Sequence, residues 1–138
     1  MEVTIYTDGA SRGNPGHASY GYLILDENNQ IIHQEGKYLG IATNNFAEYS
    51  AVLSAFSYIH QNLYKGKNMK IAVIADSKLV VEQLSGKYKI KSENLKPLIY
   101  QIKILEQTLG QIKYTHTLRA NNKRADALAN KALDDTFH

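Results

Sequence analysis

Four acidic residues stand in this sequence where their carboxylates could act together. Asp8 and Asp76 each follow a short apolar run of the kind that forms a buried strand. Glu48 lies in the first turns of a helical pattern, and Asp126 lies inside an alanine-rich one, where a free surface acid is unusual. Taken singly, each acid is explained more simply as an exposed residue, and Asp8 with Gly9 as a hairpin turn. Their similar placement at strand ends and in helices favours one common site.

Crowded carboxylates would need a partner of opposite charge. Like charges repel one another, and a divalent cation relieves the repulsion. Sites built from carboxylate oxygens select hard cations such as Mg²⁺, with Mn²⁺ as a possible substitute. A site about 4 Å across can bind two such ions, which stabilise the attacking and leaving oxygens of a phosphoryl transfer. The four acids therefore predict a two-ion site for phosphate chemistry.

The apolar patterns predict the elements that must position these acids. Three strand-like segments within the first 40 residues, separated by short turns, indicate an antiparallel meander. The rest of the pattern gives the order βββαβααβα, and strands that follow helices should run parallel to the first strand through right-handed crossovers. The sequence therefore predicts an α/β fold, a mixed sheet with helices on its faces. Parallel neighbours would bring Asp8 and Asp76 to the same edge of that sheet.

Local signals predict where the later elements begin and end. Ser92 is expected to cap a helix whose first turn contains Pro97 and which ends at Gly110. A fifth strand is expected over residues 112–118 and a last helix over about 121–133. We assign residues 1–134 to one domain and residues 135–138 to a frayed C-terminal tail.

Composition narrows the class of protein. The 138 residues suit a single domain, and 43% hydrophobic with 21% charged residues is ordinary for a globular one. A net charge of +3 permits a polyanionic partner, and the absence of cysteine excludes disulfides, thiolate zinc sites and cysteine nucleophiles. Apolar runs stay well below the roughly 18 residues of a membrane span, and Met1 leads directly into a strand. We therefore expect a cytoplasmic protein without a membrane segment or signal peptide.

Four short motifs around the acids match one known family in order and spacing over nearly the whole chain. Any one of them would be weak evidence, whereas the four together make the chain similar to a type 1 ribonuclease H. The motifs are Thr7-Asp8-Gly9-Ala10 with Gly13-Asn14-Pro15-Gly16, Thr43-Asn44-Asn45-Phe46-Ala47-Glu48, Ile74-Ala75-Asp76-Ser77, and Asn122-Lys123-Arg124-Ala125-Asp126-Ala127-Leu128-Ala129.

The resemblance implies a fold, a reaction and a set of site residues. The fold is the ribonuclease H-like fold, with a five-stranded mixed sheet of order 3-2-1-4-5. The reaction is hydrolysis of the RNA strand of an RNA–DNA hybrid, leaving 3′-hydroxyl and 5′-phosphate ends. The four acids would bind two Mg²⁺ ions. Positions matched to substrate contacts are Gly9, Asn14, Thr43, Asn44, Asn45, Ser77 and Asn122, of which Thr43 matches a position that grips a DNA phosphate. Turn and capping duties are the simpler explanation for several of these and are compatible with substrate binding.

The chain departs from the best-known bacterial members in two regions. Those members carry a longer basic protrusion after the fourth strand, whereas this chain has only a compact segment with Lys87, Lys89, Lys91 and Lys96. The loop before Asp126 lacks their Gly-His-rich pattern and resembles a subgroup in which an arginine serves that loop. Arg119 is the favoured functional group there, and His116 is the alternative, as a proton relay or as a strand-end residue.

Two other functions compete with cleavage of hybrids. One is cleavage of DNA, as by a junction resolvase or integrase of the wider fold, against which Asn14 and the Asn44-Asn45 pair argue. The other is a catalytically weak or inactive hybrid-binding module, against which the presence of all four acids argues. We expect a monomer in each case.

Overall fold

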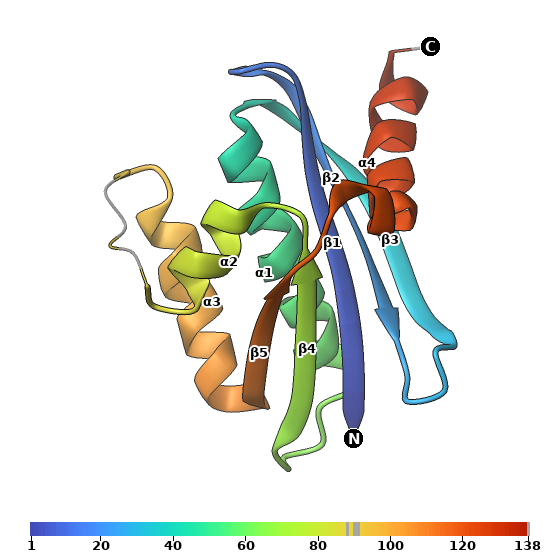
Figure 1. The fold of residues 1–138 in the computed structure, drawn as a ribbon, viewed down its shortest axis with the longest axis vertical. Coiled ribbons are helices and arrows are strands. Elements are labelled where there is room, and N and C mark those ends of the chain that lie inside the picture. The colour runs from blue at the N-terminus through green and yellow to red at the C-terminus, as the bar shows by residue number, and fades with distance from the viewer. Residues whose placement is uncertain (88, 90–91, 138) are drawn as a thin grey trace.

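A computed structural model of the chain describes residues 1–87, 89 and 92–137, and its strands form one five-stranded sheet (Figure 1). The spatial order is β3-β2-β1-β4-β5, which confirms the expected order 3-2-1-4-5. Strands β1 and β2 and strands β2 and β3 pair antiparallel, whereas β4 runs parallel to β1 and to β5. The strands are β1 Glu2–Gly13, β2 Gly16–Leu25, β3 Ile31–Ala42, β4 Met69–Ala75 and β5 Gly110–His116.

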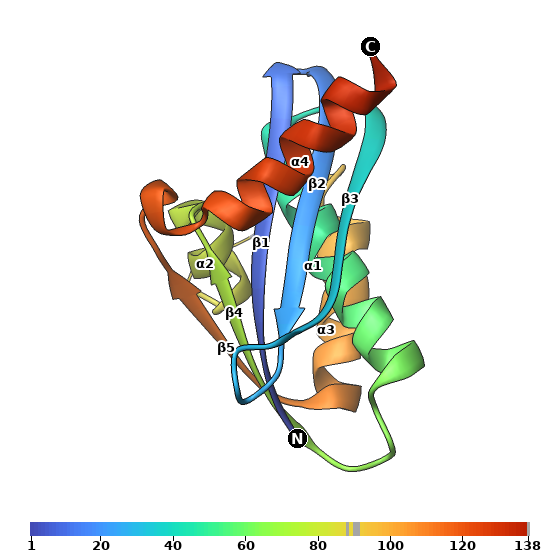
Figure 2. The same cartoon turned by 90° about the vertical axis from the view of Figure 1, so that its right-hand side faces the viewer.

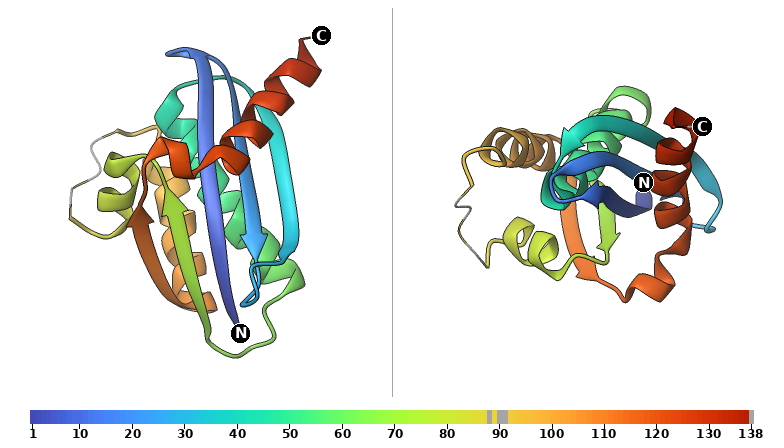
Figure 3. Two further views of the ribbon diagram at one scale, coloured as in Figure 1. Left: turned by 45° about the vertical axis from the view of Figure 1, so that its right-hand side comes forward. Right: turned by 90° about the horizontal axis from the view of Figure 1, so that it is seen from above.

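Helices cover both faces of the sheet, as predicted. Helices α1 (Asn44–Asn62), α2 (Lys78–Leu84) and α3 (Lys96–Leu109) lie on one face (Figure 2). Helix α4 (Lys123–Thr136) crosses the other face diagonally over β1, β2 and β3, after the single 3-10 turn η1 (Arg119–Asn121). Figure 3 shows the same two-sided arrangement from two further directions. Within the described residues, no helix combines the length and apolar character needed to cross a membrane.

The two faces of the sheet bury cores of very different size. The larger core lies between the sheet and the first three helices, and its fully buried side chains include Ile5, Tyr22, Phe56 and Ile102. The smaller core lies under α4. It consists of Leu23, Leu25 and Ala125, with Tyr6 and Leu128 packed against it. Strand β2 contributes to both cores because its successive side chains point to opposite faces.

Helix α4 lies directly on the backbone of the sheet because two glycines leave room for it. A Cβ atom added to Gly21 of β2 would lie 2.4 Å from the Ala125 carbonyl oxygen, and one added to Gly36 of β3 would lie 2.3 Å from that of Leu128. The Ser19 hydroxyl then donates a 2.6 Å hydrogen bond to the Ala129 carbonyl. This close approach fixes the height at which α4 carries Asp126 above the sheet.

The C-terminal tail is the main point at which the prediction is wrong. Helix α4 extends to Thr136, whereas the chain was expected to fray after residue 134. Leu133 is fully buried, Lys131 pairs with Asp135 at 2.7 Å, and the Thr136 hydroxyl donates to the Ala132 carbonyl. These contacts stabilise the last turn, which the polar sequence alone did not indicate.

Three other boundaries differ from the predicted ones. Helix α3 has Pro97 in its first turn, as expected, but it starts after Leu95 and has no side-chain cap. Ser92 contributes its carbonyl instead, which accepts from the backbone N–H groups of Leu95 and Lys96. Strand β5 ends at His116, two residues early, and residues 119–121 form η1, so α4 begins at Lys123. Within the basic segment, Lys87 and Lys89 are exposed, and Lys91 lies outside the described residues.

The close approach of α4 predicts a strong packing effect at Gly21. We expect Gly21→Ala to lower the free energy of unfolding by about 1–3 kcal/mol, because the added methyl group overlaps helix backbone that cannot move aside. Urea unfolding of the variant and the parent measures this change. Gly66→Asn is the control, since Gly66 has open space around its Cβ position and a φ of +81° that asparagine tolerates. Equal stability of both variants would contradict the packing argument.

Candidate active site

The sheet brings Asp8 and Asp76 together at one edge, as predicted. Asp76 directly follows β4, whereas Asp8 lies inside β1 and not after it, because β1 continues to Gly13 along β2. The pairing of β1 with β4 nevertheless stops at Thr7 and Ala75. Both carboxylates therefore lie where these two parallel strands separate.

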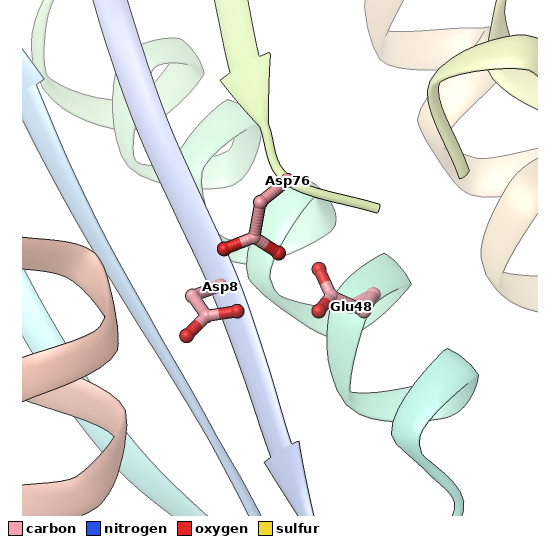
Figure 4. A group of neighbouring side chains, drawn as sticks. All are labelled: Asp8, Glu48 and Asp76. Atoms are coloured by element: carbon pink, nitrogen blue, oxygen red, sulfur yellow. The ribbon is translucent and has the colours of Figure 1, made fainter. Parts of the chain in front are cut away.

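Helix α1 adds Glu48 to this pair (Figure 4). The helix begins with a side-chain cap in which the Thr43 hydroxyl accepts from the Phe46 N–H. The helix can lie against β1 because Gly9 has no side chain: a Cβ there would lie 2.5 Å from the Glu48 nitrogen. One carboxylate oxygen from each of Asp8, Glu48 and Asp76 lies within 4.8 Å of the others. We call these three residues the carboxylate cluster.

Asp126 flanks the carboxylate cluster from α4. It lines the same cleft as Asp8, and its charge adds to the burial and the Asp76 charge that raise the pKa of Asp8. Its Oδ1 atom accepts a 3.2 Å hydrogen bond from the Asn130 amide and lies 3.7 Å from a guanidinium nitrogen of Arg119. The fourth acid thus approaches from the face of the sheet opposite to Glu48.

Burial makes the negative charges of the carboxylate cluster costly. Burial and the neighbouring Asp76 charge raise the pKa of Asp8 to about 8. Burial and the charge of Asp8 likewise raise the pKa of Glu48 well above its usual range. Among the described residues, the buried Oε2 atom of Glu48 has no hydrogen-bond partner. Hard oxygen donors, excess negative charge and an unpartnered buried acceptor all fit a divalent cation such as Mg²⁺.

Asn122 holds the site together from within. It is buried, and its side-chain amide donates to the Thr7 carbonyl at 2.8 Å and to Asp76 Oδ2 at 3.2 Å. The backbone carbonyl of Asn122 accepts from the backbone N–H of Asp126 in the first turn of α4. One residue therefore links three acid-bearing elements. Asn122 is only 1% exposed, which favours this linking role over the substrate contact that the resemblance implies.

The four acids line one cleft of about 460 Å³. Of the positions expected to contact substrate, Gly9, Asn44, Asn45 and Ser77 line the same cleft. Ser77 also caps α2, with its hydroxyl accepting from the Val80 N–H. Polar groups thus surround the carboxylate cluster on the side open to solvent.

Asn14 and Thr43 lie beside this cleft and not in it. Both line a neighbouring pocket of about 700 Å³, which Asn45 shares with the cleft. The Asn14 side-chain carbonyl accepts from the Asn44 N–H at 3.1 Å, so it fixes the start of α1 against the hairpin between β1 and β2. The capping explanation therefore holds for Thr43, and contact of either residue with a substrate strand stays a prediction.

Arg119 and His116 occupy different places. Arg119 lines the cleft with its side chain largely exposed and directed toward Asp126. His116 is exposed at the end of β5, paired in register with Ala75, and is not among the cleft-lining residues. This placement supports the preference for Arg119 as the functional group of the loop.

The sequence analysis did not single out three polar residues that line the cleft: Ser11, Arg12 and Asn130. A signal was available for two of them. Arg12 follows Asp8 by four residues and so shares its side of a strand, and Asn130 follows Asp126 by one helical turn. For Arg12, the spacing is informative only if β1 is known to continue beyond Asp8, and the Gly-rich turn obscured that continuation.

Comparisons with known proteins agree with this geometry. A family model described as reverse transcriptase-like matches residues 6–132. A bifunctional protein of Mycobacterium tuberculosis is 41% identical over 97% of this chain and 36% of its own length. Ribonuclease HI of Halobacterium salinarum is 38% identical over 96% of this chain and 65% of its own length. This chain thus spans less than two thirds of either relative. The crystal structure of LC11-RNase H1 in complex with an RNA/DNA hybrid is 36% identical, with a TM-score of 0.94 and 99% of each chain covered.

The raised pKa of Asp8 predicts how stability depends on pH without metal. The folded state holds this proton more tightly than the unfolded state, so the contribution is full below the ordinary pKa of 3.8 and is lost as pH rises toward about 8. In EDTA, the melting temperature of the wild type should therefore fall more between pH 5 and pH 8 than that of Asp8→Asn. Thermal unfolding followed by circular dichroism measures both.

Adding Mg²⁺ at pH 8 supplies the complementary measurement. The cation should raise the melting temperature of the wild type more than that of Asp8→Asn, because only the wild type offers the full set of charges. Equal shifts in the two proteins would contradict a shared ion site.

Proposed function

Because this chain belongs to the type 1 ribonuclease H family, we propose that it is an endonuclease that hydrolyses the RNA strand of RNA–DNA hybrids. The observation that carries the proposal is the carboxylate cluster of Asp8, Glu48 and Asp76 at the base of a polar cleft. Such a cluster suits phosphate chemistry and has no evident structural use, since crowding three carboxylates, of which Asp8 and Glu48 are buried, costs stability.

The four acids supply the metal ligands of the proposed reaction. Asp8, Glu48, Asp76 and Asp126 would hold two Mg²⁺ ions, or Mn²⁺ in their place, which would activate water and stabilise the charge that develops on the phosphate. Asn122 keeps Asp76 in one orientation through its 3.2 Å hydrogen bond. The proposed products carry 3′-hydroxyl and 5′-phosphate ends.

Neutral polar groups around the acids would position the hybrid. Asn44, Asn45 and Ser77 line the cleft and present amide and hydroxyl groups, which can bind 2′-hydroxyls and phosphates. The 2′-hydroxyl distinguishes RNA from DNA, so contacts to it would direct cleavage to the RNA strand. Thr43 and Asn14, in the neighbouring pocket, would contact the DNA strand and the backbone beside it.

One assay separates this function from its two competitors. Purified protein is given an RNA–DNA hybrid, duplex DNA and duplex RNA, each first with Mg²⁺ and then with EDTA. Cleavage of the RNA strand of the hybrid that EDTA abolishes supports the proposal. Cleavage of duplex DNA would indicate a DNA nuclease, and binding of the hybrid without cleavage would indicate an inactive binding module.

Asp76→Asn should separate binding from chemistry. The substitution keeps the size of the side chain and removes the charge that holds metal, so cleavage should fall by at least about a hundredfold. Hybrid affinity should persist, because phosphate and 2′-hydroxyl contacts come from other residues. Cleavage rates in Mg²⁺ and affinities at fixed salt measure the two effects. Near-normal cleavage would remove Asp76 from the catalytic set.

The loop before α4 should depend on Arg119 more than on His116. Arg119 lines the cleft beside Asp126, whereas His116 lies outside it. Arg119→Ala should therefore lower turnover about tenfold or more, and His116→Ala only a few-fold, with unchanged circular dichroism for both. A larger loss of turnover in His116→Ala would assign the role to the histidine.

A further inference from the structure

Beyond the carboxylate cluster, the cleft is lined by side chains of β1 and α4. On β1, Arg12 follows Asp8 by four residues, so both lie on the same side of the strand about 13 Å apart. On α4, Asp126, Asn130 and Asp134 follow one another at intervals of four residues, on one side of the helix, and the first and last are about 12 Å apart. Asp126 lines the same cleft as Asp8, and Asp134 pairs with Arg12.

The Arg12 guanidinium closes the far end of this trough. It lines the cleft, and its Nη2 atom lies 2.5 Å from Asp134 Oδ1. The two side chains are 49% and 57% exposed. An ion pair this open contributes little to stability, so holding the fold together does not account for the arginine.

Other contacts already fix the end of α4 to the hairpin. Leu133 is fully buried, and the Phe137 ring packs against His17 and Tyr38, with centroid distances of 4.4 and 5.5 Å. His17 is the register partner of Arg12 on the adjacent strand. Aromatic and apolar packing therefore holds the hairpin against α4 without the exposed Arg12–Asp134 pair, so Arg12 can exchange Asp134 for a ligand.

The charge of the cleft indicates what that ligand is. Four carboxylates line one end, where cations would offset their repulsion of a polyanion. A phosphate about 13 Å away lies beyond that end and needs a cation from the protein. Arg12 presents one there, in a planar form suited to bidentate contact with phosphate.

We propose that Arg12 binds a phosphate of the RNA strand away from the one that is cleaved, with Asp134 holding the guanidinium over the trough in the free protein. This inference rests on the proposed function, since the strand whose phosphate reaches the carboxylate cluster is the strand that continues along the trough. Arg12 contacts substrate and takes no part in bond breaking.

The first experiment measures affinity for an RNA–DNA hybrid in the Asp76→Asn protein at several salt concentrations. Adding Arg12→Ala should weaken binding about tenfold and lower the slope of log affinity against log salt by about 1, the value for one lost phosphate contact. Lys131→Ala is the control, because Lys131 forms an exposed ion pair with Asp135 on α4 but does not line the cleft. An unchanged slope in the Arg12 variant would overturn the proposal.

The second experiment locates the contact. A series of RNA–DNA hybrids is prepared in which one neutral methylphosphonate replaces a different linkage of the RNA strand each time. A hybrid with a deoxynucleotide phosphodiester at the same position is the reference. The Asp76→Asn protein should lose affinity at one linkage near the cleaved bond, and the protein that also carries Arg12→Ala should be insensitive there. Identical profiles in the two proteins would overturn the proposal.

Different results would contradict the proposed function and the role of Arg12. A wild-type protein that neither binds nor cleaves hybrids contradicts the proposed function. A wild-type protein that cleaves hybrids, combined with unchanged methylphosphonate profiles in the Arg12 variant, contradicts only the role of Arg12.

Discussion

Mutual repulsion among buried carboxylates is the constraint that the rest of this fold must satisfy. Asp8 and Glu48 are almost fully buried, and an oxygen of each lies within 4.8 Å of Asp76. Without a cation, the protein lowers the cost partly by holding protons, as the raised pKa values of Asp8 and Glu48 indicate. The scaffold must therefore keep these groups together against their own tendency to separate. The large core behind β1, β4 and α1 supplies the necessary free energy.

Backbone contact and one amide turn that scaffold into a defined geometry. Gly9 lets α1 approach β1 until the Glu48 backbone nearly touches the strand, and Gly21 does the same for α4. Asn122 then joins the strand beside Asp8, the carboxylate of Asp76 and the start of the helix that bears Asp126. The elements that carry the four acids are thus held against one another by direct backbone contacts and by the hydrogen bonds of Asn122.

The sequence predicted the element order, the sheet order and the grouping of the acids, because these depend on local apolar patterns and on recognisable motifs. It did not predict that Asp8 lies mid-strand, since the continuation of β1 depends on pairing with β2 beyond a Gly-rich turn. The buried position of Asn122 and the alignment of Arg12 with Asp134 also depend on long-range packing. The helical end of α4 was missed because its sequence is polar, and the buried contact of Leu133 and the packing of Phe137 on His17 and Tyr38 depend on long-range packing.

Because the cores on the two faces of the sheet differ in size, the four acids are not supported equally. Asp8, Glu48 and Asp76 lie on or next to elements that pack into the large core, whereas Asp126 is carried by a helix that packs on Leu23 and Leu25 through Ala125 and Leu128. Local opening of a segment costs less free energy when it exposes less apolar surface. Opening of α4 would therefore cost less free energy than opening of the elements that carry the other three acids. The meeting of all four acids in one cleft then depends on the free energy that holds this one helix against the sheet.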